Sequence, residues 1–347
     1  MKKVLHLAEN RKNAINKFVP DFQALIEEEG LDNDFIYVGD GTGLKKSKNV
    51  NIYSPRLLCC LKIIWKTFFY EKVILHSLPT SKLLLFLLPF VFLSKKFYLV
   101  LWGGEIHHKK YNKTSFLSKF GDVIRYLALR FIWGIITDID SDYEIVQQKY
   151  KNKGIRVNLS GFYPSNIFYD IKCSNVPKDK VNVLIGASAA KRNCHERILA
   201  TIRNIPVTKN MTFICPLSYG DPENAKVVDA EWKAIYGDKF QPIFEFMELS
   251  EYRRLLSDID IALFAFDEQQ ALGNIRNLLG FGCKVYLNSG SIAYKELVNK
   301  GFDIYDIDEI TDFSFDEDNS NNQVLVKKLY SRKNTIRKIK AFLNSNE

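Results

Sequence analysis

The hydrophobic positions of this chain follow two alternating spacings along nearly its whole length. Short continuous apolar runs, typical of strands buried on both faces, are followed by segments in which apolar residues recur every three or four positions, as in amphipathic helices. The first half predicts strands at residues 4–8, 35–38, 73–75, 97–101, 134–138 and 156–159, with helices at 18–29, 57–69, 81–93, 117–131 and 142–151. Such an alternation predicts a parallel sheet covered by helices on both faces.

A second series of the same kind follows a turn-rich break at residues 160–165. It predicts strands at 181–185, 211–216, 240–243, 259–264, 284–287 and 303–304, with helices at 195–203, 222–236, 250–256, 271–281, 292–300 and 322–343. A length of 347 residues also favours two domains. The expected fold is therefore α/β, with two Rossmann-like domains, 1–160 and 161–347, facing each other across a cleft. The last helix could pack back on the first domain instead of on the second.

The charge of the chain is concentrated in its first half. Residues 1–160 contain 25 Lys and Arg against 15 Asp and Glu, a balance of +10, whereas the remainder contains 24 against 25, a balance of −1. Within residues 56–96, lysines are interleaved with leucine, isoleucine and aromatic residues. Helices of this kind can lie on a bilayer with the basic side towards anionic headgroups, or can be ordinary core helices with solvated lysines. We favour an anionic membrane surface as a partner.

Other features limit the class of protein. The longest apolar run, residues 83–93, contains Pro89 and is too short to span a bilayer. The N-terminus does not read as a signal peptide, and the six cysteines lack C-x-x-C spacing, so we expect a cytoplasmic protein with reduced thiols. The five histidines are scattered apart from one adjacent pair, which predicts no metal site.

The most informative candidate site is a polar loop that leads into the helix at 271–281. Gln269 and Gln270 precede that helix, and Gly273 and Asn274 lie in its first turn. The first N–H groups of a helix lack intrahelical partners and favour negative charge, and a glycine there would let a phosphate approach the backbone. The segment therefore predicts a phosphate site, although many α/β proteins have such turns for structural reasons alone.

Three further turns follow predicted strands of the second half, where ligands of parallel sheets bind. Small residues around Gly186 and Ser188 would admit a ligand close to the backbone, and Tyr219 could stack on a base or sugar. The candidate residues for holding a nucleotide sugar in these turns are Gly186, Ser188, Tyr219, Phe246, Met247 and Glu248. A plain strand-to-helix turn, a helix cap and core aromatic residues are the respective structural alternatives.

In the first half, the run Trp102-Gly103-Gly104-Glu105 follows the strand at 97–101. Gly103 and Gly104 permit close backbone approach, and the carboxylate of Glu105 could take a proton from an attacking hydroxyl. Glu105 is the predicted catalytic residue. His107 and His108 join the two glycines as candidates on the acceptor side, and the alternative is a solvated loop.

Several of these motifs together resemble glycosyltransferase family 56. The resemblance is carried by Pro-Leu-Ser-Tyr-Gly at 216–220, Gly-Asp-Lys-Phe at 237–240, residues 269–275 and the Trp-Gly-Gly-acid run at 102–105. The family comprises the bacterial TDP-4-acetamido-4,6-dideoxygalactose:lipid-linked saccharide transferases of enterobacterial common antigen synthesis. The resemblance implies a GT-B fold, a dTDP-sugar donor bound by the second half and a polyprenyl-pyrophosphate-linked saccharide acceptor held by the first half. It also implies no metal or other cofactor, and a peripheral location on the cytoplasmic face of the inner membrane.

The chain departs from the family pattern at two positions. Glu105 stands where the family more often has Asp, and Gly186-Ala187-Ser188 stands where it usually has Gly-Asn-Ser. The second departure leaves a different deoxysugar, such as a fucose-type residue, open as the donor sugar. A sugar-nucleotide epimerase on the same scaffold is an alternative enzyme. A basic nucleic-acid-binding protein is the non-enzymatic alternative, but the chain has no recognition module, and we expect no nucleic acid as a partner.

Overall fold

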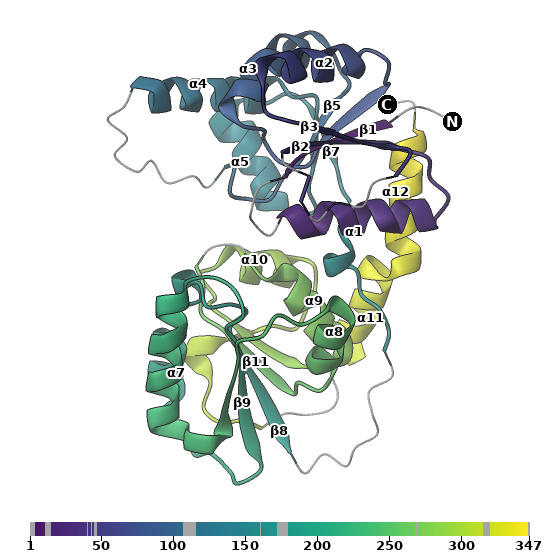
Figure 1. The fold of residues 1–347 in the computed structure, drawn as a ribbon. Helices are drawn as coiled ribbons and strands as arrows, with labels where there is room; N and C mark the ends of the chain where they lie inside the picture. The colour runs from purple at the N-terminus through teal and green to yellow at the C-terminus, as the bar shows by residue number, and fades with distance from the viewer. Residues whose placement is uncertain are drawn as a thin grey trace. The chain divides into compact units, whose positions relative to one another are not determined.

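The computed structural model describes residues 4–10, 15–39, 41–42, 44, 47–106, 116–159, 161–171, 180–267, 270–314 and 320–345. The chain folds into two compact units, each containing one sheet (Figure 1). The first unit consists of residues 1–164 together with 335–347, and the second consists of residues 165–334.

In the described part of the first unit, the sheet has seven strands, in the order β3-β2-β1-β4-β5-β6-β7. All of the pairings are parallel. The strands are β1 (Val4–Asn10), β2 (Asp34–Gly39), β3 (Val50–Tyr53), β4 (Lys72–Leu75), β5 (Phe97–Val100), β6 (Gly134–Ile136) and β7 (Ile155–Val157). The order in which the chain adds strands reverses between β1 and β4. The carboxyl ends of the strands at such a reversal are the usual ligand site of doubly wound sheets.

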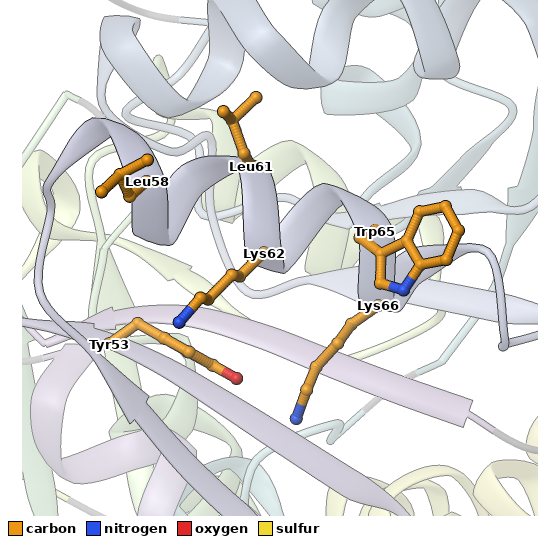
Figure 2. A pocket seen from close by; sticks show the side chains of 6 residues that line it. All are labelled: Tyr53, Leu58, Leu61, Lys62, Trp65 and Lys66. Carbon is orange, nitrogen blue, oxygen red and sulfur yellow. The ribbon is translucent and has the colours of Figure 1, made fainter.

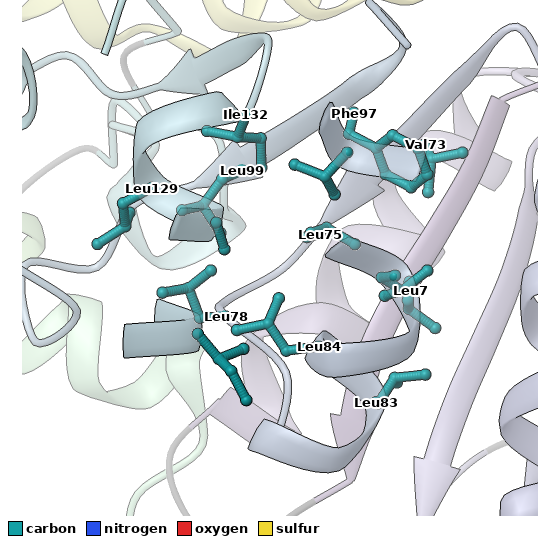
Figure 3. Packing of buried hydrophobic residues seen from close by; sticks show 14 of the residues in the cluster. Leu7, Val73, Leu75, Leu78, Leu83, Leu84, Phe97, Leu99, Leu129 and Ile132 are labelled. Atoms are coloured by element: carbon teal, nitrogen blue, oxygen red, sulfur yellow. The ribbon is translucent and has the colours of Figure 1, made fainter. Parts of the chain in front are cut away.

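Helices cover both faces of the first sheet. One face packs against α2 (Leu57–Thr67), α3 (Ser81–Leu93), α4 (Phe116–Phe131) and α5 (Asp140–Tyr150), and the other against α1 (Ile15–Glu28) and α12 (Arg332–Asn344). Figure 3 shows the first of these cores, in which Leu75 and Leu99 of the sheet lie among leucines of the covering helices. β4 and β5 are buried at every position, and apart from Lys72 at the start of β4 their sequences are the continuous apolar runs expected of central parallel strands.

The C-terminal helix α12 is held in the first unit by polar contacts as well as by packing. The buried Lys72 Nζ donates to the backbone oxygen of Phe342, and Lys340 Nζ lies 2.8 Å from Oε2 of Glu29. The prediction of one helix over 322–343 was wrong, because the chain breaks at Ser331, which forms an isolated bridge with Phe168. The preceding helix, α11 (Ser320–Tyr330), packs in the second unit.

In the described part of the second unit, the sheet has six parallel strands, in the order β10-β9-β8-β11-β12-β13. They are β8 (Val181–Ile185), β9 (Met211–Pro216), β10 (Phe240–Ile243), β11 (Ile261–Phe264), β12 (Lys284–Leu287) and β13 (Tyr305–Asp306). One face is covered by α6 (His195–Ile202) and α7 (Pro222–Tyr236), and the other by α8 (Leu249–Ser257), α9 (Leu272–Phe281), α10 (Ile292–Asn299) and α11. Here the order reverses between β8 and β11, again a ligand-binding position.

Local sequence signals explain several boundaries. Asp221 caps α7 by accepting the N–H groups of Glu223 and Asn224 at 3.0 and 3.3 Å, and Pro222 occupies the first turn. Two strand predictions were wrong: β3 was not predicted, and β13 lies at 305–306 rather than at 303–304. The described residues also contain short 3-10 turns: η1 (Pro164–Asn166), η2 (Lys191–Asn193), η3 (Gly237–Lys239) and η4 (Ile307–Glu309).

Candidate functional site

The loop after β8, at the reversal point of the second sheet, has a fixed shape. Gly186 has a φ of +62°, and a Cβ at this position would lie 2.8 Å from Nε2 of His195. Asn193 holds the next two residues: its Oδ1 accepts the N–H of Ala187 at 3.0 Å, and its Nδ2 donates to Oγ of Ser188 at 2.9 Å. Glycine is therefore required for both conformation and space, and the position of the Ser188 hydroxyl is set by the loop.

Tyr219, three residues after β9, lies beside this loop. The backbones of the two loops meet at the Ala189–Gly220 bridge, and the N–H of Ala189 donates to the backbone oxygen of Tyr219 at 2.8 Å, which places Tyr219 next to Ser188. Burial raises the pKa of Tyr219, although Ser188 and the charge of Arg192 oppose the shift, so the phenol is protonated at neutral pH. Because Tyr219 as a whole is 54% exposed, its ring is accessible to a ligand.

Two residues from helices complete a polar cluster with Ser188 and Tyr219. Asn274 in α9 donates from Nδ2 to the hydroxyl of Tyr252 in α8 at 2.9 Å. Burial raises the pKa of Tyr252, and the nearby Tyr219 adds to that increase. We call Ser188, Tyr219, Tyr252 and Asn274 the tyrosine cluster. The structure thus brings together three predicted residues, and Tyr252 is the member that sequence reasoning missed.

The start of α9 is not capped by the side chain of its first residue. Ala271 is left-handed, with a φ of +56°, and no side chain caps the helix. The first N–H groups of a helix have no intrahelical acceptor and make its start attractive to anions. Phosphate binding at this helix start stays a prediction.

The two predicted residues beside this helix start have protein partners of their own. A Cβ on Gly273 would lie 2.6 Å from Oδ1 of Asn166 and 2.8 Å from the backbone oxygen of Ser165, so packing alone explains the glycine. Gln270 donates from Nε2 to the backbone oxygen of Arg192 at 2.9 Å, which ties the α9 loop to η2. Gln269 lies outside the described residues.

Positive side chains near the β8 loop were not among the predicted site residues. Lys191 and Arg192 form most of η2 and are exposed. Arg197 on α6 pairs with Asp308 at 2.7 Å. It also lies 3.8 Å from Asp267, three residues after the end of β11. The signal that could have revealed them is a Lys-Arg pair three residues after Ser188, in a turn already suspected of holding phosphate.

The predicted segment Phe246, Met247 and Glu248 follows the edge strand β10. Phe246 is 57% exposed, Met247 is half-buried, and Glu248 precedes the first residue of α8 without capping it. Phe246 is thus a surface aromatic residue rather than part of the core.

At the carboxyl edge of the first sheet, Glu105 is a buried carboxylate. It is 7% exposed, and its Oε2 accepts the backbone N–H of Trp102 at 3.0 Å. Burial raises the pKa of Glu105, opposed in part by backbone N–H groups and by the charge of Arg125. A raised carboxyl pKa suits a general base that must take up a proton near neutral pH. Gly103 has a φ of +84°, Gly104 is exposed, and His107 and His108 lie outside the described residues.

A buried chain of side chains that the sequence did not reveal lies at the same edge. His6 Nδ1 is 2.9 Å from His76 Nε2, and His76 Nδ1 is 2.7 Å from the hydroxyl of Tyr163. Trp102 stacks on Tyr163, with ring centroids 4.6 Å apart, and donates from Nε1 to the His76 backbone oxygen at 3.0 Å. These groups fix Trp102, and therefore the N–H that binds Glu105.

A second carboxylate at this edge was also missed. Glu9 near the end of β1 is buried, and its Oε1 accepts the N–H of Thr80 at 2.6 Å. Among the residues that the structure describes, no three His, Cys, Asp or Glu side chains form a group suited to a metal ion.

Comparison with known proteins identifies the family and the fold. The model of the family described as 4-alpha-L-fucosyltransferase glycosyl transferase group 56 matches residues 59–328. HepE from Anabaena, solved in complex with UDP and glucose, is 13% identical over 99% of each chain, with a TM-score of 0.70. Sucrose-phosphate synthase from Thermosynechococcus elongatus is 11% identical over 99% of this chain and 98% of that one, with a TM-score of 0.68.

WaaG, a glycosyltransferase involved in lipopolysaccharide biosynthesis, is 8% identical over 99% of this chain and 95% of that one, with a TM-score of 0.58. At such identities the likeness concerns the fold. The GT-B fold expected from the sequence, with two Rossmann-like domains, is confirmed.

Proposed function

The chain belongs to glycosyltransferase group 56, and on this premise we propose that it transfers a deoxysugar from a dTDP-linked donor to a polyprenyl-pyrophosphate-linked saccharide. It is a glycosyltransferase that uses a nucleotide sugar. The deoxysugar is 4-acetamido-4,6-dideoxygalactose or a fucose-type residue. The observation that carries the donor assignment is the meeting of the tyrosine cluster with the uncapped start of α9 at the reversal point of the second sheet.

In this proposal the second unit holds the donor. The diphosphate lies at the amide groups of the α9 start, with Gln270 and Ser188 as further hydrogen-bond donors and with Lys191 and Arg192 balancing its charge. Tyr219 and the 246–248 segment hold the nucleoside. The negative charge that develops on the diphosphate as the sugar departs is stabilised by dipoles that are already oriented, which is the main way a site of this kind lowers a barrier.

The first unit supplies the base. The acceptor hydroxyl oxygen forms a bond to the anomeric carbon, and its proton passes to the carboxylate of Glu105. The bond between the anomeric carbon and the diphosphate oxygen breaks, and its electron pair leaves on the nucleoside diphosphate. The buried setting of Glu105 supports this role, since a carboxylate with a raised pKa is a stronger base than a solvated one.

The acceptor is a membrane lipid, so we propose that the enzyme works on the cytoplasmic face of the inner membrane as a peripheral protein. Exposed leucines and aromatic residues on α2, α3 and α4 support this location. No helix in the described ranges is long and apolar enough to cross a bilayer.

A thermal-shift screen of dTDP, UDP, GDP and CMP tests the donor assignment, because a ligand of the native state raises the melting temperature by mass action. We expect dTDP to give the largest shift. A transfer assay with dTDP-deoxysugar and a polyprenyl-pyrophosphate saccharide then tests the reaction. An isomerised donor formed without acceptor would instead identify an epimerase, and failure of all four nucleotides to bind would overturn the donor site.

A further inference from the structure

The first unit exposes a continuous apolar surface on one side of its sheet. Large side chains of α2 and α3 are unusually open to solvent, among them Leu58 at 72%, Trp65 at 67% and Leu93 at 76% exposure. Ring contacts link neighbouring helices at this surface: Phe68, just after α2, packs on Phe90 of α3 with centroids 5.2 Å apart, and Phe92 of α3 packs on Phe131 of α4 at 4.5 Å. A soluble surface seldom leaves so many contiguous apolar side chains uncovered.

A groove of about 460 Å³ lies within this surface, between α2 and β3. It is lined by Tyr53, Leu58, Leu61, Lys62, Trp65 and Lys66. Figure 2 shows the side chains of Lys62 and Lys66 extending from α2 towards Tyr53. Lys66 Nζ is fixed by Oδ1 of Asn51 at 3.0 Å and lies 5.6 Å from the centre of the Tyr53 ring, while Lys62 is exposed. Two lysine side chains therefore line the groove together with leucine and tryptophan.

The charge of the surrounding elements agrees with an anionic occupant. Neither α2 nor α3 contains an Asp or Glu, and Lys82, Lys95 and Lys96 add positive charge at the ends of α3. Lysines beside exposed tryptophan and leucine are typical of helices that lie in a membrane interface. This arrangement favours a lipid surface over a protein partner as the occupant.

We propose that this groove binds the phosphate headgroup of an anionic phospholipid, with Lys62 and Lys66 on the phosphate and with Leu58, Leu61 and Trp65 entering the acyl layer. This inference rests on the proposed function, in which the enzyme works at a membrane surface, and it assigns the contact with that surface to the α2 and β3 side of the first unit. It concerns the bulk phospholipid and not the polyprenyl acceptor.

Vesicle binding by the full-length protein tests the groove without any need for catalysis. Vesicles of phosphatidylcholine alone are compared with vesicles that also contain phosphatidylglycerol, and neither contains polyprenyl lipid. We expect binding to the second kind, with a blue shift of tryptophan emission that is absent in Trp65→Phe. One lysine near an anionic surface contributes about fivefold in affinity, so Lys62→Glu with Lys66→Glu should weaken binding by at least about tenfold.

Two controls keep the result specific. Lys209→Glu with Lys226→Glu makes the same change of charge at exposed positions of the second unit and should leave binding unchanged. Lys62→Glu alone changes an exposed lysine without touching the Lys66–Asn51 bond, so it guards against loss of binding through misfolding. Equal binding to both vesicle types, or equal losses in the groove and control variants, would overturn the groove.

The donor screen separates this inference from the proposed function. Nucleotide-dependent stabilisation of the wild type without vesicle binding would refute the groove and leave the transferase proposal standing. Vesicle binding that depends on Lys62 and Lys66, in a protein that binds no nucleotide, would support the groove and refute the donor site.

Discussion

The backbone N–H of Trp102 donates a hydrogen bond to Oε2 of Glu105, with 3.0 Å between nitrogen and oxygen. This bond closes the turn through Gly103 and Gly104 and holds the carboxylate at the edge of the first sheet. The relationship makes the role of Glu105 open to direct test.

Glu105→Gln should lower kcat by about 100-fold or more, the range found when a general base is lost, with dTDP affinity unchanged. The carboxylate must be deprotonated to act, and burial raises its pKa, so wild-type kcat should fall on acidification at a higher pH than a solvated glutamate would give. Steady-state kinetics over pH 5 to 8 measure both effects. Glu9→Gln is the matched variant, because Glu9 is a buried carboxylate at the same sheet edge. If Glu9→Gln alone abolished turnover, the base would have to be reassigned.

Tyr219 should contribute to nucleotide binding mainly through its ring. Tyr219→Phe removes one hydroxyl, which is expected to raise the Kd for dTDP about fivefold. Tyr219→Ala also removes stacking, worth about 1–3 kcal/mol per base, and should raise the Kd by tenfold or more. Isothermal titration calorimetry measures both, with Tyr305→Ala as an exposed tyrosine control in the same unit. Equal affinities for wild type and Tyr219→Ala would exclude the ring from the nucleoside site.

The β8 loop should tolerate no side chain at its first position. Gly186→Ala combines a positive φ with a Cβ only 2.8 Å from Nε2 of His195. Gly301→Ala isolates the backbone cost, since Gly301 has a φ of +85° and its Cβ would meet only Leu325 at an ordinary 3.8 Å. The control should lose about 1–2 kcal/mol of unfolding free energy, and Gly186→Ala should lose more because the imidazole must move. Urea unfolding compares them, and a smaller loss for Gly186→Ala would contradict the loop geometry.

Stability should decline on mild acidification because three histidines are buried. Burial lowers the pKa of His76 to about 3 and of His195 to about 4, from 6.5, and also lowers that of His6. Above pH 6.5 these imidazoles are neutral in both states and add no pH dependence. Below it the unfolded chain binds protons that the folded chain does not, so the unfolding free energy falls by up to about 1.4 kcal/mol per pH unit for each histidine.

The contribution of His195 can be isolated by urea unfolding at pH 7.5 and 5.5. His195→Asn removes one titrating group from the second unit, and its stability should fall less between the two pH values than that of the wild type. Parallel losses in both proteins would show that His195 is protonated in the folded state.

Much of the fold could be predicted because parallel strands buried on both faces leave unbroken apolar runs. β4 and β5 are of this kind, whereas β3 is half-buried throughout, carries Asn51 in its middle and gives no such run. The break between α11 and α12 depends on pairing of Ser331 with Phe168, a contact far apart in sequence that no helical periodicity encodes.

The sequence predicted which turns carry the candidate site residues, but not which side chains contact them. Turns after strands located Ser188, Tyr219 and Glu105, because sheet topology fixes where such turns lie. The burial of Glu105 and the His6–His76–Tyr163 chain depend on contacts between residues 70 and 87 positions apart. Only the folded chain brings those side chains together, so no pattern of neighbouring residues could have predicted these contacts.

The C-terminal helix α12 supplies Ile339, Phe342 and Leu343 to the same core as Val4 and Phe35 of the first strands. During synthesis on the ribosome, the amino-terminal unit is therefore made first but finished last. All residues of the second unit, 165–334, are synthesised before the first unit receives its last helix. Premature termination near the end of translation would thus leave the second unit complete and open the interior of the first.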